Sequence, residues 1–402
     1  MNRVAITGLG TVNALGQDAA ATARALRQGR SAIGPLTDIP TELLQIKIGA
    51  QIAGFDPLAH FEEKRLSVLD RCSQIALVAA REAVAQCGLD LRGALSSRTA
   101  AIIGSGVGGM GTLDDAFHRL YAKGNSRSPP MTIPRMMISA AVSHITMEHG
   151  ITGPAFTVAS ACASANHAIG TAFQMVRAGG VDVAVTGGTE SVFTIGTLKA
   201  WEAMRILAPD TCRPFSADRM GLVLGEGAAV LVLENYDHAR ARGAKILGEI
   251  IGFGASADAA DIVSPSSEGA AAAMRACLAD CALAPEAFDY INAHGTGTAA
   301  NDISETRAIH AVFGAHAGRL AVSSTKSLHG HCLGSAAAIE LAATLLAMQG
   351  GFIPPTANFT RPDPQCDLDY VPNETRTGAI NLALSNAFAF GGLNAVLAIR
   401  AA

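Results

Sequence analysis

Short apolar runs, most of which end in glycine, alternate along the whole chain with alanine-rich stretches of helical character. The runs of strand character include VAITGLG, AAIIGSGVGG, VDVAVTGG, AAVLVLE, YINAHGTG, LAVSSTKS and INLALSNAFAFGG. This alternation is typical of α/β proteins, in which helices cover mixed or parallel sheets. No low-complexity tract or proline-rich linker interrupts it, so we expect any two domains to share a wide interface.

The composition favours buried strands. Of the 402 residues, 49% are hydrophobic, only 16% are charged and 42 are glycine, which suits an α/β protein better than a disordered or coiled-coil chain. The formal net charge of -4 argues against a general nucleic-acid or membrane-surface binder. We expect no secretory leader and no apolar run long enough to span a bilayer.

The eight cysteines do not have the spacing of a disulfide framework or of a zinc site. Cys277 and Cys281 are four residues apart and are interpreted as one face of a helix. The sequence therefore predicts a reduced, cytoplasmic protein, in which a thiol remains available as a nucleophile.

An internal similarity relates the two halves of the chain. In the first half a strand runs into Cys162 and then into the helix-like ASANHAIGTAFQMVRAG. In the second half LAVSSTKS leads through Gly330, His331 and Gly334 into SAAAIELAATLLAMQG. Two similar halves would bring corresponding strand ends face to face across one pocket.

The stretch GSGVGGMG, which begins at Gly104, fits the dinucleotide-binding pattern G-x-G-x-x-G after a strand. No clear acidic residue ends the next strand, and DDAFHRLYAKGNSRSPP breaks the expected unit. We therefore favour a tight turn beside a pocket over a nucleotide site.

Three chemically useful side chains lie near strand ends: Cys162, His294 in NAHGTGT and His331 in TKSLHGHCLG. A thiol at a helix N-terminus is favoured as thiolate, and two imidazoles aimed at one carbonyl oxygen would stabilise an enolate. Taken singly, each has a structural alternative, because free cysteine is often buried and lone histidines are often satisfied core residues. Together they form a coherent site.

Longer motifs surround these residues, namely SACAS, RPFSADRMGLVLGEGA, NAHGTGTAANDISE, SSTKSLHGHCLGSAAAIE and PPTANFTRPDPQCDLDYVPN. In these motifs and their order, from VAITGLGTVNALG to FGGLNAVLAIR, the chain resembles the β-ketoacyl-acyl-carrier-protein synthases. The resemblance is to the elongating KAS II type of thiolase-like condensing enzymes, and within it to nodulation-protein-E-like and polyene-type ketosynthases.

The resemblance implies an α/β, thiolase-like fold with five layers, αβαβα, built from two similar halves. We place the half that carries the nucleophilic cysteine at residues 1–245 and the half that carries both histidines at residues 246–402. It also implies an intimate dimer, either a homodimer or a heterodimer with a chain-length-factor-like subunit. Acyl carrier protein is the expected partner, with no nucleic acid and no membrane.

The resemblance also implies roles at the centre of the site. Cys162 would accept the acyl group, and His294 and His331 would serve decarboxylation and condensation. Lys326 would order the site, with Glu305 as its partner. His329 lies two residues before His331 and competes for the second histidine position, although the Gly-His pairing favours His331.

Other implied roles concern the substrate. Phe390 would cover Cys162 and supply an oxyanion-hole N–H. Thr296 and Thr298 would meet the phosphopantetheine arm, Ser264 would be a further substrate-binding residue, and Val107 would shape the acyl tunnel. That arm arrives on the carrier protein, so no bound cofactor and no catalytic metal are expected. A structural monovalent cation near Asn292, Glu305 and Glu340 is implied, with a purely polar structural role as the alternative.

The chain departs from the family pattern at the turn FAFGGLN, where Ala389 and Leu393 replace Gly and Thr. Since alanine tolerates fewer backbone conformations than glycine, we expect Ala389 to stiffen the turn that carries Phe390. Position 263 is Val where relatives often carry Thr. The expected carrier-protein contacts are Lys64, Arg127 and Arg205.

The sequence therefore predicts a decarboxylative Claisen condensation of an acyl group on Cys162 with a malonyl group on the carrier protein, which yields 3-oxoacyl-carrier protein. The pathway would be fatty acid or polyene/polyketide elongation. Thiolase chemistry is disfavoured because FAFGGLN contains no second cysteine. A chain-length-factor-like partner subunit is the non-enzymatic alternative, although such subunits typically lack the nucleophile.

Overall fold

Ten strands form one continuous hydrogen-bonded order in the computed structural model, which describes all residues from Met1 to Ala402, and this order divides at its middle into two five-stranded mixed sheets of identical topology. The first sheet has the order β1 (Val4–Asn13), β7 (Gly227–Asn235), β6 (Val183–Glu190), β4 (Thr99–Gly104), β5 (Ala155–Val158). The second has the order β8 (Gly248–Ala257), β14 (Leu393–Ala401), β13 (Leu382–Ala389), β9 (Tyr290–Asn292), β10 (Ala321–Ser323). In each sheet the first two neighbouring pairs are antiparallel and the last two are parallel.

The two sheets meet at their first strands. β1 pairs antiparallel with β8, with Val4 opposite Ile250 and Ile6 opposite Gly248. The strand order therefore repeats outward from this seam, and the prediction of two similar halves is confirmed.

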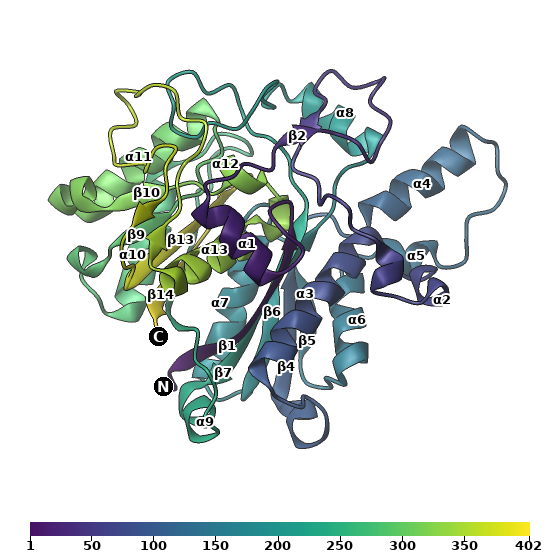
Figure 1. Cartoon of the computed structure of the whole chain (residues 1–402), viewed down its shortest axis with the longest axis horizontal. Helices are drawn as coiled ribbons and strands as arrows, with labels where there is room; N and C mark the ends of the chain where they lie inside the picture. The colour runs from purple at the N-terminus through teal and green to yellow at the C-terminus, as the bar shows by residue number, and fades with distance from the viewer.

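Helices complete five layers, as Figure 1 shows. The helices are α1 (Ala19–Arg27), α2 (Glu63–Leu66), α3 (Arg71–Cys87), α4 (Met110–Tyr121), α5 (Thr132–Met136), α6 (Ala140–His149), α7 (Ser164–Arg177), α8 (Ile195–Ala203), α9 (Tyr236–Ala241), α10 (Ser267–Cys281), α11 (Ala299–Phe313), α12 (Lys326–His329) and α13 (Ala336–Gly350). Helices α3 and α6 cover the outer face of the first sheet, α10 and α11 cover that of the second, and α7 and α13 lie between the sheets. The αβαβα prediction is confirmed.

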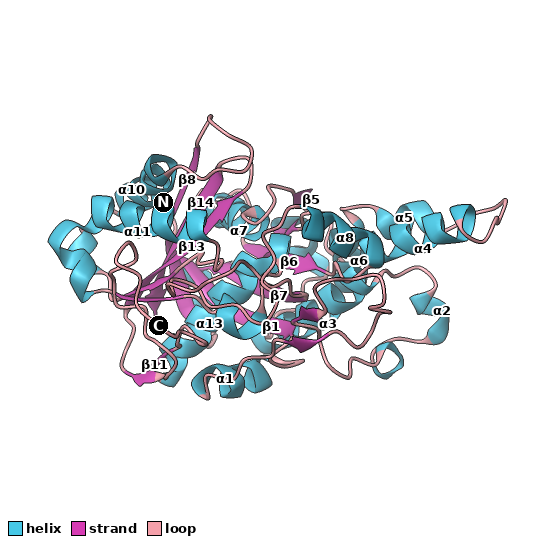
Figure 2. Cartoon of the chain, turned by 90° about the horizontal axis from the view of Figure 1, so that it is seen from above, coloured by secondary structure: helices cyan, strands magenta, loops and turns pink.

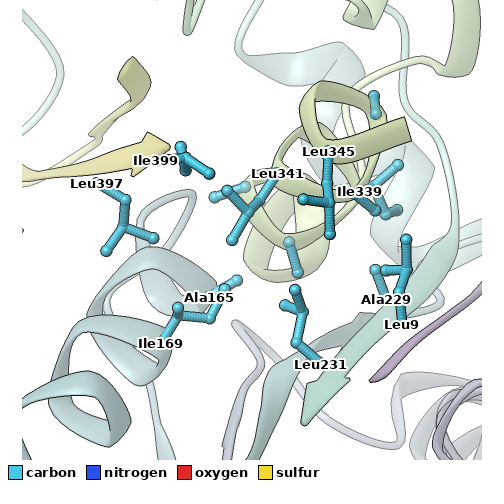
Figure 3. Packing of buried hydrophobic residues seen from close by; sticks show 14 of the residues in the cluster. Leu9, Ala165, Ile169, Ala229, Leu231, Ile339, Leu341, Leu345, Leu397 and Ile399 are labelled. Carbon is cyan, nitrogen blue, oxygen red and sulfur yellow. The ribbon is translucent and has the colours of Figure 1, made fainter. Parts of the chain in front are cut away.

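The central layer explains the apolar composition. All of β4 and β6 is buried, as expected for strands covered on both faces. Leu341 and Leu345 of α13 lie between Leu231 of the first sheet and Leu397 of the second (Figure 3).

The segment Leu333–Gly350, which contains α13, corrects one expectation. With a mean hydropathy of 1.3 it is long and apolar enough to span a membrane by length and composition. Because 83% of it is buried inside the protein, it is here the central helix of the core.

Smaller elements surround the layers. The short strands are β2 (Gly34–Pro35), β3 (Ile48–Gly49), β11 (Phe352–Ile353) and β12 (Arg376–Thr377), and the 3-10 turns are η1 (Pro57–Ala59), η2 (Gly93–Arg98), η3 (Pro285–Ala287), η4 (Gly314–Arg319) and η5 (Leu333–Ser335). Helices α4 and α5 project from one end of the molecule, with α2 nearby (Figure 2). Strand β5 is the free edge of the first sheet, and Phe156 in it is exposed.

Candidate active site

Cys162 lies in the tight turn between β5 and α7. Ala161 before it has a left-handed φ of 48°, a conformation that costs roughly 1–2 kcal/mol in a residue with a side chain. Ser164 closes the turn, because its Oγ donates to the Ala161 carbonyl at 2.7 Å and accepts the Ser160 N–H at 2.9 Å. The motif SACAS thus turns the Cys162 side chain inward, where it is buried.

Helix α7 is fixed against the second half of the chain by Asn166. This buried side chain donates from Nδ2 to the carbonyl oxygens of Ser385 at 3.0 Å and Ala395 at 3.2 Å, in β13 and β14. The position of the nucleophile therefore depends on the last two strands.

His331 approaches Cys162 from the other half. Its backbone N–H donates to Val223 at 2.7 Å, and its Nδ1 accepts the Leu333 N–H at 3.3 Å. With Nδ1 acting as an acceptor, a neutral imidazole carries its proton on Nε2. That Nε2 lies 3.1 Å from Cys162 Sγ, so it points a donor at the nucleophile.

His329 has a different environment from His331. Its two ring nitrogens contact the Gly330 carbonyl at 2.8 Å and Thr325 Oγ1 at 3.0 Å. The cavity beside Cys162 is lined by His331 and not by His329.

His294 follows β9 and is held by groups behind it. Glu305 accepts the backbone N–H groups of His294 at 2.9 Å and Gly295 at 2.8 Å. Lys326 Nζ donates to the His294 carbonyl at 2.5 Å and lies 3.4 Å from its Nδ1. An ammonium group can only donate, so His294 also has its proton on Nε2.

Lys326 forms its ion pair with Glu340 of α13, and both side chains are fully buried. The expected pairing with Glu305 is therefore wrong. Glu340 reaches Lys326 because α13 runs directly behind the site, whereas both oxygens of Glu305 are engaged by backbone N–H groups.

Burial dominates the electrostatics of these groups. It raises the pKa of the Cys162 thiol to about 11, opposed by the charge of Lys326 and by a hydrogen bond from the Phe390 backbone N–H. The expectation that the helix start would favour the thiolate is therefore not met in the resting site. Burial and the nearby Lys326 charge also hold the pKa values of His294 and His331 well below 6.5, so both imidazoles are neutral.

Cys162 Sγ and ring nitrogens of His294 and His331 all lie within 4.8 Å of one another. A thiol and two imidazoles are also the donor types that bind Zn²⁺. In both histidines, however, Nδ1 faces a donor and the proton is on Nε2, so the remaining ring nitrogen is a hydrogen-bond donor and not a metal ligand. The arrangement is better suited to a nucleophile with two neutral donors.

The gate turn (Phe390–Gly392) connects β13 with β14 above Cys162. Gly391 and Gly392 have φ values of 82° and 68°, which glycine adopts without strain. The Gly391 N–H donates to the Ile262 carbonyl at 2.8 Å. Ala389, immediately before the turn, pairs with Leu393 in the last rung of the hairpin.

A cavity of about 100 Å³ leads to Cys162. Thr296 and Thr298 line it, and their hydroxyls hydrogen-bond to each other at 2.8 Å. Ser264 does not line it: this residue is exposed, and the lining comes from its neighbours Val263 and Pro265.

Val107 also lies outside this cavity. It is partly exposed, and its backbone N–H donates to Glu190 at 3.3 Å. The GSGVGGMG stretch thus forms the turn predicted after β4, and the buried Glu190 accepts the N–H groups of Gly106 at 2.6 Å and Gly334 at 3.0 Å.

The three expected carrier-protein contacts are exposed but lie in different places. Arg205 follows α8, next to the cavity residue Ile206. Lys64 is on α2, and Arg127 is in the loop between α4 and α5 at the projecting end of the molecule (Figure 2).

Four buried oxygen atoms behind the site have no hydrogen-bond partner: Asn292 Oδ1, Glu340 Oε2, Ser385 Oγ and Asn386 Oδ1. Asn292 is in register with Ser385 on adjacent strands, and its Nδ2 donates to the Glu340 carbonyl at 3.3 Å. Buried unpaired oxygens are costly, and such a set fits a monovalent cation.

Sequence reasoning did not identify Trp201, Glu190 or the pairing of Lys326 with Glu340. Trp201 is the only tryptophan of the chain and lies in the cavity wall. The presence of a single tryptophan was the only feature of the sequence that could have drawn attention to this position. Glu190 follows the predicted run VDVAVTGG by two residues, but nothing in the sequence shows which N–H groups it accepts.

The fold and the site together define a thiolase-like condensing enzyme. The family model for "Beta-ketoacyl synthase, N-terminal domain" matches residues 1–239, and that for "Beta-ketoacyl synthase, C-terminal domain" matches residues 247–360. The chain belongs to the β-ketoacyl synthase family.

Curated relatives cover nearly the whole chain. Nodulation protein E of Rhizobium sp. (strain N33) is 52% identical over 99% of both chains. The 3-oxoacyl-[acyl-carrier-protein] synthase 2 of Staphylococcus aureus (strain N315) is 39% identical over 99% of this chain and 98% of its own. The recognition of this family from the sequence is confirmed.

Solved structures agree. The ishigamide ketosynthase/chain length factor superposes with a TM-score of 0.95 at 34% identity, covering 100% of this chain and 99% of its own. A type II PKS ketosynthase in complex with its acyl-carrier protein superposes with a TM-score of 0.91 at 27% identity, covering 100% of both chains. The prediction of an acyltransferase of the 3-oxoacyl-carrier-protein synthase type is confirmed.

Proposed function

We propose that Cys162 carries the growing acyl chain and that His294 and His331 drive the decarboxylation of the malonyl extender. The observation that carries this proposal is the approach of Cys162 Sγ and the two imidazoles within 4.8 Å. In the first step the thiol attacks the acyl thioester of the carrier protein. The acyl C–S bond to phosphopantetheine breaks, and the thiol proton leaves with the departing pantetheine sulfur.

The second step uses the neutral donors. Malonyl thioester loses carbon dioxide, and negative charge develops on its carbonyl oxygen. The Nε2–H groups of His294 and His331 stabilise this enolate, and each such donor contributes on the order of 100- to 1,000-fold in rate. A neutral imidazole with a fixed tautomer donates without first gaining a proton.

In the third step the enolate carbon attacks the acyl group on Cys162 and forms the new C–C bond. The sulfur of Cys162 leaves, and 3-oxoacyl-carrier protein is released. The Phe390 N–H and the charge of Lys326, which both lower the pKa of Cys162, stabilise the departing thiolate. The backbone N–H groups of Cys162 and Phe390 serve as the oxyanion hole.

The partners follow from this reaction. Thr296 and Thr298 contact the phosphopantetheine arm in the cavity, Val107 shapes the acyl tunnel, and Lys64, Arg127 and Arg205 receive the acidic carrier protein. We assign Cys162 to a half at residues 1–245 and both histidines to a half at residues 246–402. The relatives with an acyl-carrier protein and with a chain length factor support a carrier partner and a homodimer or heterodimer.

Two further assignments concern the protein as a whole. The eight cysteines are free thiols, which supports the cytoplasm as its location. Asn292, Glu305 and Glu340, together with Ser385 and Asn386, would surround a structural monovalent cation, which would pair the oxygens that are otherwise unsatisfied.

Intact-mass spectrometry after incubation with a panel of acyl-carrier proteins tests this function. The wild type should gain the mass of one acyl group, and the Cys162→Ala variant should gain none. A wild-type chain that stays unmodified by every acyl-carrier protein, and produces no 3-oxoacyl product alone, would instead support the chain-length-factor-like role.

A further inference from the structure

The gate turn contacts an aromatic residue with no assigned role. The Phe390 and Trp201 rings stack with centroids 6.2 Å apart and planes 23° from parallel. This separation lies within the range of favourable aromatic pairs. Both rings line the cavity that leads to Cys162.

The two rings differ in how firmly they are held. Trp201 is on α8 and packs against the buried cluster that contains Leu198, Leu222 and Phe193. Phe390 is followed by Gly391 and Gly392, two glycines with positive φ. The tryptophan is thus fixed to the core, whereas the phenylalanine is carried by the more adaptable backbone.

We propose that Trp201 is the latch of the gate: its stacking on Phe390 holds the gate turn over Cys162 when no acyl chain is present. The proposal rests on the proposed function, in which Phe390 must leave this position for an acyl group to enter. Trp201 is a positioning residue, since it acts through Phe390. Loss of an aromatic pair shifts the ratio of closed to open gate by roughly 2- to 10-fold.

The first experiment compares acylation rates of Cys162 by rapid-quench intact-mass spectrometry. We expect Trp201→Leu, which removes the stacking ring, to accelerate acylation roughly 2- to 10-fold. Trp201→Phe keeps a stacking ring and should restore a rate close to that of the wild type. Ile206→Ala is the matched control for cavity volume, because it shortens another side chain that lines the cavity and keeps both rings of the stack, and its gain in rate should be smaller than that of Trp201→Leu.

Two results would overturn the latch. One is a Trp201→Leu rate equal to that of the wild type. The other is an equal gain in Ile206→Ala, which would make cavity volume the cause.

The second experiment uses the wild-type fold and does not depend on the Leu variant folding. Because Trp201 is the only tryptophan, its fluorescence reports this stack alone. We expect its emission to change when Cys162 is acylated, and the change to be absent in Phe390→Leu acylated to the same extent. Unchanged emission in a wild-type chain that mass spectrometry shows to be acylated refutes the latch only. Absence of acylation refutes the proposed function, and the latch with it.

Discussion

The two halves of the molecule use one topology for different chemistry. Strands β5 and β10 each lead toward an inner helix, α7 and α13. Cys162 lies just before α7, and His331 lies shortly before α13. The first half therefore supplies the nucleophile, and the second half supplies a donor, from corresponding places.

The turns after β4 and β9 extend this comparison. In the first half Glu190 accepts the N–H groups of Gly106 and Val107, a turn without a reactive side chain. In the second half Glu305 accepts those of His294 and Gly295. In both halves a buried glutamate side chain holds the backbone after a strand, and the residue in the turn decides whether the turn takes part in the chemistry.

Removing the one reactive group of the first half should have the largest effect. We expect Cys162→Ser to lower the condensation rate about 1,000-fold or more, because a buried hydroxyl with no adjacent base is far less ionised than a thiol. The measurement is the formation of 3-oxoacyl product. Product formation near the wild-type rate would show that the first half does not supply the nucleophile.

Removing a donor of the second half should affect one step selectively. His294→Ala and His331→Ala should each slow malonyl decarboxylation by on the order of 100- to 1,000-fold. Cys162 should still accept an acyl group, since both imidazoles act as Nε2–H donors and not as bases.

Separate assays of decarboxylation and acyl-enzyme formation test this division. If a histidine variant lost decarboxylation and acyl-enzyme formation to the same extent, the two halves would not have separate roles in the reaction. A larger loss of decarboxylation in His329→Ala than in His331→Ala would show that the wrong histidine was assigned.

The pH dependence of stability should show a smaller effect of the two buried glutamates, one in each half. Burial raises the pKa of both Glu190 and Glu305 from 4.5 to about 7. Between these values the unfolded chain ionises while the folded chain stays protonated, so each carboxyl's contribution to stability is complete below about pH 4.5 and is lost as the pH rises to about 7. The full change is on the order of 3 kcal/mol for each.

Glu190→Gln and Glu305→Gln lack this titration. The free energy of unfolding of each variant, relative to the wild type, should therefore improve from pH 5 to pH 8. Thermal unfolding across that range provides the measurement. A difference that is constant with pH would contradict the shifted pKa, and a response from only one variant would show that the halves are not equivalent.

The smallest effect concerns Ala389 beside the gate turn. We expect Ala389→Gly to speed acyl loading or to broaden the range of acyl chains accepted, because glycine relaxes the backbone that carries Phe390. A stability loss of about 0.5–1 kcal/mol should accompany it. Acyl-enzyme formation across chain lengths is the readout, and an unchanged profile would show that Ala389 does not restrict the turn.

Local patterns in the sequence were sufficient for the fold class and for much of the site. The short apolar runs predicted β1, β4, β6, β7, β9, β10 and β13, since buried strands have a strong apolar signal. Strands β8 and β14 were not singled out. The repeated strand-to-helix pattern correctly placed Cys162 and His331 on opposite sides of one pocket.

Contacts between distant segments were beyond the sequence. Lys326 was assigned to Glu305, but the packing of α13 brings Glu340 to it instead. The start of a helix alone favours a thiolate at Cys162. In the folded protein, however, burial by both halves raises the pKa of this thiol. Ser264 was placed one position away from the residues that line the cavity.

The anchoring of Asn166 in α7 to β13 and β14 has a consequence for protein synthesis. Chains emerge from the ribosome with the N-terminal end first, so the carbonyl groups of Ser385 and Ala395 appear near the end of translation. Until then the segment around Cys162 lacks the contacts that fix it. A chain that ends before residue 385 would therefore contain Cys162 but not the strands that fix its position. The active site can form only when translation is almost complete.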